Sequence, residues 1–272
     1  MRIAFIGGGN MTTSLIGGLR HRGVSAGTLR VSDPVPIQLE RLRHEFDVQG
    51  SADSAAVVRD AEMIVLAVKP QDMAEAARAI APALAGRRRV VISIAAGIRL
   101  ADLAGWLGRG VPTVRAMPNR PALIGAGVTA LYAGSEVSAA ERDSVEQLMT
   151  AAGATVWLAE ESQMDAVTAI SGSGPAYFFL LIEALEAAGV ELGLPQETAQ
   201  RLAVETARGA GRMAAEGDEA PATLREQVTS TGGTTAAALE VLEAGDVRGI
   251  FRRAVWAAAR RSAQLADQFG GT

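Results

Sequence analysis

The segment 221–239 brings hydroxyl side chains and a glycine pair together in a pattern that suits the binding of a small anion. An amphipathic stretch leads into V-T-S-T-G-G-T-T, and a run rich in Ala, Leu and Val follows at once. Paired glycines let the backbone approach a ligand without a Cβ in the way. The free N–H groups and the positive dipole end of the following helix favour a carboxylate. An ordinary helix–turn–helix joint capped by Thr234 or Thr235 is the alternative.

The amino terminus carries a second pattern with chemical meaning: a strand, a glycine turn and the start of a helix. The dinucleotide fingerprint G-x-G-x-x-G/A fits at Gly7, Gly9 and Thr12, with Thr12 in place of the small third residue. Because a strand precedes the turn and a helix follows it, we predict a dinucleotide site here rather than a simple helix N-cap.

Ser32 and Asp33 end the next strand, at the distance where the fingerprint expects a residue that reads the ribose. A carboxylate here suits the two hydroxyls of an NAD ribose and repels a 2′-phosphate. Ser32, Arg30 or Arg41 would instead favour the phosphate. The residues therefore lean toward NAD without deciding between NAD and NADP.

Three further segments follow predicted strands, at the sheet edge where such folds bind ligands. Ala67–Pro70 contains Lys69, the single lysine of the chain, which would face a cofactor phosphate or ribose unless it is a solvated strand-end lysine. Ala95 lies in a run of small residues where a flat nicotinamide ring fits. Asn119, in M-P-N-R-P, would shape a turn beside that ring, with a plain Asn turn as the alternative.

The elements that position these residues alternate between strand and helix over residues 1–160. Apolar strands separated by helices predict an α/β fold with a Rossmann-type, mostly parallel sheet covered on both faces. We expect strands at 2–6, 29–32, 63–68, 90–94, 111–117, 128–132 and 155–158, and helices at 10–22, 37–46, 73–84, 100–107 and 139–151.

Residues 161–272 show no strand signal and are predicted to form a second, all-helical domain. We expect helices at 164–170, 175–188, 196–215, 222–228, 235–243 and 247–269. Some segments, such as 178–185, are apolar around most of their circumference, so we expect them to be buried. A domain of this size can barely bury so many helices alone, which predicts dimerisation through this half.

Composition excludes several classes of protein. A net charge of -4, a pI of about 5.4 and 4% aromatic residues give no case for binding nucleic acid or an anionic membrane. The absence of cysteine excludes disulfides, thiol catalysis and Cys-ligated zinc, and is compatible with a cytoplasmic location. We expect no metal site and no signal peptide. The most apolar later stretch, 177–182, is cut by Glu183 and is expected to be too short to span a bilayer.

Together these motifs resemble the pyrroline-5-carboxylate reductase family over essentially the whole chain. The resemblance rests on I-G-G-G-N-M from Ile6, A-V-K-P-Q from Ala67, M-P-N-R-P from Met117, S-G-S-G-P-A-Y-F from Ser171 and V-T-S-T-G-G-T-T from Val228. It implies a Rossmann domain and a helical domain that interlocks with a second subunit, with dimers able to build larger rings. It also implies hydride transfer from NADPH or NADH to C5 of 1-pyrroline-5-carboxylate, giving L-proline in the last step of proline biosynthesis.

The resemblance carries over to individual residues. Ser230, Gly232, Gly233 and Thr234 would hold the substrate carboxylate on the helix N-terminus, and Thr235 would hydrogen-bond the ring nitrogen. Asp218 matches an acidic position that helps to form that site in some members. Ser230, Thr235 and Asp218 are thus the candidate catalytic residues. With the patterns above, the expected cofactor site comprises Gly7, Gly8, Gly9, Asn10, Met11, Ser32, Asp33, Ser54, Ala67, Val68, Lys69, Pro70, Ala95 and Asn119.

Two departures from the family concern the expected sites. Thr231 stands where many members have proline, in the carboxylate loop, and Ser54 stands where many have asparagine, near the adenosine ribose. Members often use NADPH, whereas Asp33 favours NADH. The chemistry needs no strong base, because a protonated imine is already an electrophile and the protein has mainly to orient donor and acceptor.

Two other functions compete with this assignment. Another two-domain Rossmann reductase, acting on a different imine or on a β-hydroxyacid, is the first; the hydroxyacid type needs a lysine on an early helix of the second domain, and this chain has none there. A nucleotide-binding regulatory protein without turnover is the second. The hydroxyl–glycine loop disfavours it, because it supplies a second site suited to a small acid.

Overall fold

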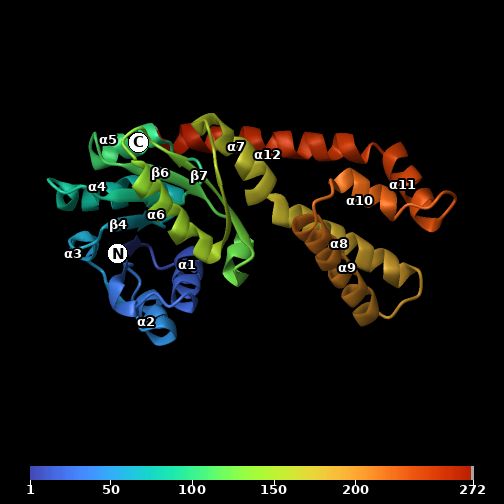
Figure 1. The fold of residues 1–272 in the computed structure, drawn as a ribbon, viewed down its shortest axis with the longest axis horizontal. Coiled ribbons are helices and arrows are strands. Elements are labelled where there is room, and N and C mark those ends of the chain that lie inside the picture. The colour runs from blue at the N-terminus through green and yellow to red at the C-terminus, as the bar shows by residue number, and fades with distance from the viewer. Residues whose placement is uncertain (271–272) are drawn as a thin grey trace. The chain divides into compact units, whose positions relative to one another are not determined.

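The structure is a computed structural model that describes residues 1–270, and the chain packs as two compact units (Figure 1). The first unit comprises residues 1–172 together with 258–270, and the second comprises residues 173–257. The first unit is an α/β unit and the second is helical, as the sequence predicts. Residues 258–270 therefore pack with the first unit although they follow the second in the sequence. The single boundary at residue 160, predicted from secondary structure, does not describe this division.

Within the described residues, the strands of the first unit form one sheet in the order β3-β2-β1-β4-β5-β6-β7-β8. All neighbouring pairs are parallel except β6 with β7, which are antiparallel. The expected mostly parallel sheet is thereby confirmed. The strands are β1 Ile3–Ile6, β2 Leu29–Ser32, β3 Gln49–Ser51, β4 Met63–Leu66, β5 Val90–Ser93, β6 Thr113–Met117, β7 Gly127–Ala133 and β8 Gly153–Trp157.

Helices cover both faces of this sheet, which explains why its strands are apolar on both sides. On β1, Ile3 and Phe5 join one buried cluster with α1, α2 and α6, whereas Ala4 and Ile6 join another with α3, α4 and α5. These helices are α1 Asn10–His21, α2 Pro36–Phe46, α3 Ser54–Val58, α4 Met73–Leu84, α5 Leu100–Leu107 and α6 Ala139–Met149. Shorter turns complete the unit: 3₁₀ turns at Ala26–Thr28, Pro70–Asp72, Arg120–Ile124, Thr150–Ala152 and Glu161–Gln163, the helix α7 Met164–Val167, and a π-turn at Thr168–Gly172.

The sheet order reverses beside β1, because β2 lies on one side of it and β4 on the other. In open α/β sheets, ligands bind in the crevice outside the carboxyl ends of the strands at such a switch point. The glycine turn follows β1 directly, since Gly7 N–H donates to Ser32 O (2.7 Å) and Ala67 N–H donates to Ile6 O (2.7 Å). The fold therefore places the turn at the sheet edge that suits a ligand.

The helical unit contains α8 Gly174–Glu191, α9 Gln196–Glu216, α10 Pro221–Gln227, α11 Thr234–Ala244 and the first part of α12 Val247–Gly270. The end of α12 belongs to the first unit. There, Ser262 Oγ donates to Asp165 Oδ1 (2.6 Å), and Arg99 pairs with Asp267 (2.6 Å). Gly97 gives close access to this helix, because a Cβ on it would lie 3.2 Å from Ala266 N.

The second unit exposes most of its large apolar side chains within a single chain. Phe178, Phe179 and Leu180 on α8 are 65%, 59% and 65% exposed. The expectation that 178–185 is buried therefore fails for the isolated chain, because too few helices are present to cover this surface. Among the described residues, the helical stretch Glu161–Glu191 is long and apolar enough to cross a membrane by length and composition alone. The expectation that this apolar region is too short to span a bilayer is therefore wrong by length and composition.

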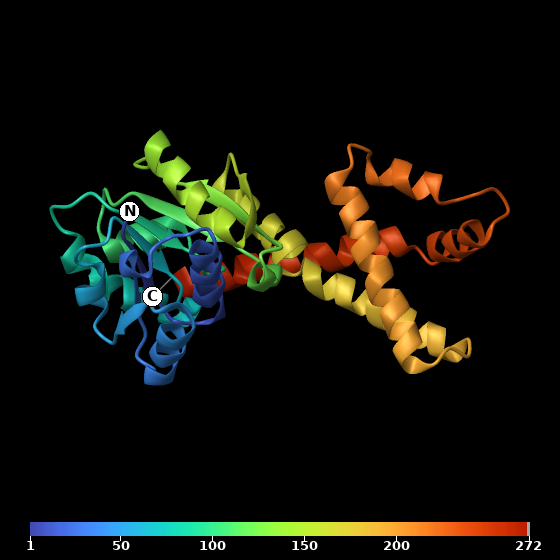
Figure 2. The same ribbon diagram turned by 60° about the horizontal axis from the view of Figure 1, so that its bottom comes forward.

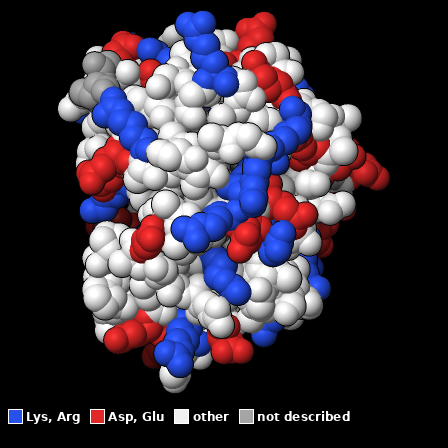
Figure 3. Space-filling model, turned by 90° about the vertical axis from the view of Figure 1, so that its left-hand side faces the viewer, with Lys and Arg blue, Asp and Glu red and all other residues white. Residues whose placement is uncertain are grey.

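Charged side chains of both signs are interspersed on the face of the molecule shown in Figure 3. This mixture agrees with the small net charge of the whole chain. His21 and His44, the two histidines, are both exposed.

Two helical glycines should respond oppositely to replacement by alanine. A Cβ on Gly18 of α1 would overlap the carbonyl oxygen of Ala151, whereas a Cβ on Gly105 of α5 would meet nothing within 4 Å. Gly18→Ala should therefore lower the free energy of unfolding by about 1–3 kcal/mol through overpacking. Gly105→Ala should leave it unchanged or raise it by about 0.5–1 kcal/mol. Thermal unfolding at one protein concentration measures both; equal effects would contradict the close approach of α1 to the turn at 150–152.

Candidate active site

One candidate ligand site is the glycine turn between β1 and α1. Gly7 has φ +104°, and a Cβ on it would lie 2.7 Å from Ala67 O and 3.1 Å from Val68 N. Only glycine fits there, because the turn crosses directly over the end of β4 and needs positive φ. The predicted glycine requirement therefore has a physical cause in the neighbouring strand.

Side chains hold all three carbonyl oxygens of this turn. Thr12, which the fingerprint match left unexplained, is fully buried and uses its hydroxyl for one of these bonds. Its place in the pattern is thus a structural one. The bonds run from Thr12 Oγ1 to Gly7 O (2.6 Å), from Arg41 Nη2 to Gly8 O (3.1 Å) and from Thr13 Oγ1 to Gly9 O (3.1 Å).

The N–H groups that follow are open. Within the described chain, those of Gly9, Asn10 and Met11 make no hydrogen bond, and Gly9, the N-cap of α1, supplies no side-chain cap. A Cβ on Gly9 would meet nothing within 4 Å. Free N–H groups at the positive end of a helix attract phosphate. This turn therefore fits the diphosphate of a dinucleotide.

The predicted ribose residues lie at the end of β2. Ser32 Oγ and Ser54 Oγ are 2.9 Å apart, so the two hydroxyls form one polar pair. Asp33 accepts from backbone at both oxygens: Gly8 N–H donates to Oδ2 (2.7 Å) and Val35 N–H donates to Oδ1 (2.8 Å). A carboxylate has about four lone-pair sites, so roughly half of its accepting capacity serves the protein.

The other predicted cofactor residues follow neighbouring strands at the same edge. Ala67 and Val68 come directly after β4 and are partly buried, and Lys69 is exposed before the 3₁₀ turn at Pro70. Ala95, after β5, is partly buried. Because β1, β4 and β5 are adjacent and parallel, their carboxyl ends bring these segments together at the glycine turn.

Asn119 uses both ends of its amide within the protein. Its Oδ1 accepts from Val128 N–H (2.9 Å), and its Nδ2 donates to Ser171 O (3.1 Å) in the π-turn. The M-P-N-R-P and S-G-S-G-P motifs, which lie far apart in the sequence, are therefore joined by this side chain. Its first function is to hold these two segments, and a role beside the nicotinamide stays a prediction.

A second candidate ligand site is the loop before α11, in the helical unit. Gly232 has φ +71°, Gly233 N–H donates to Ser230 O (3.0 Å), and a Cβ on Gly233 would overlap Ser230 Oγ. The N-cap of α11 is Gly233, without a side-chain cap. Capping by Thr234 or Thr235, the alternative weighed from the sequence, does not occur, because both lie inside the first turn.

The open end of α11 has the groups that a carboxylate needs. Within the described residues, the N–H groups of Thr234, Thr235 and Ala236 make no hydrogen bond, and Thr234 and Ser230 are exposed. Asp218 is exposed in the link between α9 and α10. The next residue, Glu219, ties this link to α10, because its Oε1 accepts from Gln227 Nε2 (2.6 Å). The arrangement offers N–H donors and hydroxyls but no strong base.

An ion pair completes α11 at its other end. Arg248 bonds both oxygens of Glu243, with Nη2 2.7 Å from Oε1. This hydrogen bond holds the pKa of Glu243 below its ordinary value. A bare carboxylate in the last turn of a helix would be unfavourable, so Arg248 neutralises a charge that the helix dipole opposes.

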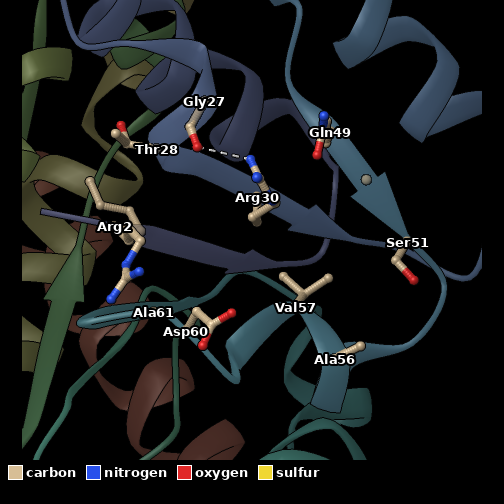
Figure 4. Close-up of a pocket in the computed structure, with 12 residues that line it drawn as sticks. Arg2, Gly27, Thr28, Arg30, Gln49, Ser51, Ala56, Val57, Asp60 and Ala61 are labelled. Atoms are coloured by element: carbon tan, nitrogen blue, oxygen red, sulfur yellow. Dashed lines mark hydrogen bonds between the residues drawn. The ribbon is translucent and has the colours of Figure 1, made fainter.

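A hollow of about 510 Å³ lies at the amino ends of the strands, away from the glycine turn (Figure 4). Arg2, Arg30 and Asp60 are among its lining residues. Arg30 already donates to Gly27 O (3.1 Å) and Leu29 O (3.0 Å), as Figure 4 shows for the first bond. This is the wrong edge for a Rossmann ligand, so the hollow is not part of the candidate site.

Comparison with known proteins matches the whole chain. A family model for pyrroline-5-carboxylate reductase dimerisation matches residues 161–265, and one for coenzyme F420-dependent NADP oxidoreductase matches residues 2–97. A pyrroline-5-carboxylate reductase of Pseudomonas aeruginosa is 50% identical over 269 residues, covering 99% of this chain and 98% of the relative. That of Haemophilus influenzae is 41% identical, covering 98% of each.

Solved structures agree. A pyrroline-5-carboxylate reductase from Coxiella burnetii has a TM-score of 0.94 and 38% identity, covering 97% of this chain and 98% of the other. A pyrroline carboxylate reductase from Plasmodium falciparum, solved with NADP bound, has a TM-score of 0.85 and 28% identity, with 98% of each chain covered.

Gly9 and Gly7 should separate a ligand requirement from a folding requirement. Gly9→Ala adds a methyl group into open space, so the melting temperature should stay at the wild-type value while the Kd for NADPH and NADH rises about tenfold. Gly7→Ala should lower the melting temperature as well, because its Cβ meets Ala67. Fluorescence titration and thermal unfolding measure these changes; undisturbed cofactor binding by Gly9→Ala would contradict a diphosphate at this turn.

Proposed function

The chain belongs to the pyrroline-5-carboxylate reductase family, and we propose which ligand of that enzyme each of its two open helix N-termini binds. The enzyme is an NAD(P)H-dependent oxidoreductase that converts 1-pyrroline-5-carboxylate to L-proline, the last step of proline biosynthesis. In our proposal, the glycine turn before α1 holds the cofactor and the loop before α11 holds the substrate. The uncapped N-terminus of α11 behind a hydroxyl–glycine loop is the observation that carries it.

The cofactor site fits the residues present. The open N–H groups of residues 9–11 would bind the diphosphate, and Ser32, Ser54 and Asp33 lie where the adenosine ribose is expected. Ala67–Pro70 and Ala95 would flank the nicotinamide half. When bound, the reduced nicotinamide supplies a hydride.

The substrate site is built around the carboxylate. Ser230, Gly232, Gly233 and Thr234 would surround it with N–H and hydroxyl donors at the positive end of α11. Thr235 Oγ1 would hydrogen-bond the ring nitrogen and so fix which face of C5 is presented. Addition of hydride to C5 of the protonated imine leaves a neutral amine, so the residues have to orient the ring rather than remove a proton. Asp218 would help to close the site.

We propose NADPH as the cofactor, with NADH as the alternative. The match to an NADP oxidoreductase model and the NADP-bound relative favour NADPH. Asp33 favours NADH by charge, but both of its oxygens already accept backbone N–H groups. These bonds give Asp33 a structural task within the protein, so its presence at this position is not by itself evidence for NADH.

We propose further that the helical unit pairs with a second copy, in the cytoplasm, and that dimers build larger rings. The dimerisation model spans residues 161–265, and the large apolar side chains of α8 are exposed in the single chain. A second copy suits this surface better than a lipid bilayer, because α8 also carries Glu183, Glu186 and Glu191. Nucleic acid is not among the proposed partners, given the net charge.

A different two-domain reductase remains the alternative function. A hydroxyacid reductase of this class would need an acid or base near the substrate, and the second unit contains no lysine or histidine. The loop before α11 fits a carboxylated imine better, because that substrate needs donors and orientation only.

Turnover of pyrroline-5-carboxylate tests the substrate site directly. Thr235→Ala should lower kcat/KM about tenfold or more through loss of one hydrogen bond to a charged ring nitrogen, with the cofactor Kd unchanged. Thr198→Ala, which removes an exposed hydroxyl from α9, serves as the matched control and should behave as wild type. Wild-type protein that oxidises neither cofactor would refute the assigned reaction, and full activity in Thr235→Ala would refute the assigned site.

The helical surface gives a second test. Leu180→Glu places a charge on the exposed apolar face of α8 and should convert the wild-type dimer or ring to monomer. Val156→Glu, at a 52% exposed apolar residue of the first unit, should leave the assembly unchanged. Sedimentation velocity reports the mass; a monomeric wild type, or a dimeric Leu180→Glu, would contradict pairing through α8.

A further inference from the structure

We propose that Asp33 and Arg41 are positioning residues that form a clamp: they hold the N–H and the carbonyl of Gly8, and so keep the two peptide groups that flank it, and the glycine turn, in a ligand-ready shape before the cofactor arrives. This inference rests on the proposed function, because it takes the glycine turn as the cofactor site. It assigns Asp33 a different first task from ribose reading, and it adds Arg41 to the residues on which cofactor binding depends.

The clamp grips both polar groups of one residue. Gly8 N–H donates to Asp33 Oδ2 (2.7 Å), and Gly8 O accepts from Arg41 Nη2 (3.1 Å). Asp33 follows β2 and Arg41 lies on α2, so one β–α segment supplies both side chains of the clamp. The same segment packs against the turn, since a Cβ on Gly8 would lie 3.3 Å from side-chain atoms of Gln38 and Leu42.

The clamp extends to the next peptide. Arg41 Nη2 also donates to Thr13 Oγ1 (2.8 Å), and Thr13 Oγ1 in turn donates to Gly9 O (3.1 Å). With the bond from Thr12 to Gly7 O, every carbonyl oxygen of the turn is occupied, while the N–H groups of residues 9–11 are open. An anion therefore meets donors and not competing oxygens. A turn held in this state loses less conformational entropy when the ligand binds.

The side chains of Asp33 and Arg41 both use their polar groups for hydrogen bonds within the protein. Asp33 uses its second oxygen for Val35 N–H (2.8 Å), so both oxygens shape backbone. The Nε of Arg41 is buried and has no hydrogen-bond partner within the described chain. A buried donor without a partner is unfavourable. The guanidinium nevertheless keeps this orientation, in which its Nη2 bonds Gly8 O and Thr13 Oγ1.

The clamp and a ribose-reading role predict different measurements. Asp33→Ala, Arg41→Ala and the double variant should each be titrated with NADPH and with NADH, without substrate, by fluorescence. If the residues position the turn, each single change raises both Kd values about tenfold and leaves their ratio within about twofold of wild type. Because both side chains act on one residue, Gly8, the double variant should lose less than the product of the two single effects.

Matched controls are available on α2 and α6. Arg43→Ala removes an exposed arginine two residues further along α2, and Asp143→Ala removes an exposed aspartate of α6; both should bind as wild type. If a clamp variant unfolds, Asp33→Asn and Arg41→Lys keep one bond each and should show a smaller, still parallel, loss. Thermal unfolding identifies any variant that has lost its fold.

Three outcomes would overturn the proposal. A tenfold change in the ratio of the Kd for NADPH to the Kd for NADH, in Asp33→Ala alone, would show that Asp33 reads the ribose. Wild-type affinity in both single variants, or full multiplicative loss in the double variant, would show that the two side chains do not share a task. Failure of the proposed function is separate, since wild-type protein would then bind neither cofactor or turn over no pyrroline-5-carboxylate.

Discussion

Both candidate ligand sites depend on helices that begin without a side-chain cap. The first N–H groups of any helix have no partner within it, and most helices satisfy some of them with a Ser, Thr, Asp or Asn side chain. In this protein, Ser138 caps α6 and Asp53 caps α3 in that way. At α1 and α11 the N-cap is Gly9 and Gly233, and the donors stay open. In our proposal, the anions of cofactor and substrate would complete these two helices by accepting hydrogen bonds from their open N–H groups.

The core of the first unit holds the N-terminus of α1 in place. The buried clusters on both faces fix β1 against β2 and β4, and β4 brings the Ala67 carbonyl so close to the turn that only glycine fits at position 7. Backbone geometry of this kind tolerates little change, because interiors are close-packed. The second unit is different in kind, because α8 leaves large apolar side chains exposed within the single chain. If it pairs with a second copy as we propose, its stability depends on protein concentration.

Much of this could be read from the sequence, where the signal is local. Apolar strands and helical periodicity predicted the sheet, although β3 was missed because Gln49, Gly50 and Ser51 carry no apolar pattern. The motif before α11 identified the family, but not that Gly233 rather than a threonine is the N-cap. The partners of Asp33, Arg41 and Asn119 could not be predicted, because each lies on another element whose distance only the folded chain sets. Burial of α8 was misjudged, since a helix apolar all round does not reveal whether its own chain covers it.

The long helix α12 has a consequence for the order in which the molecule is completed. It is 24 residues long, starts in the second unit and ends packed on the first, where Ser262 meets Asp165 and Asp267 meets Arg99. The first unit is therefore discontinuous in the sequence. During synthesis its sheet can form early, but these contacts must wait until residues 258–270 have left the ribosome. The nascent protein thus carries a first unit that stays incomplete until the second unit and α12 have also been made.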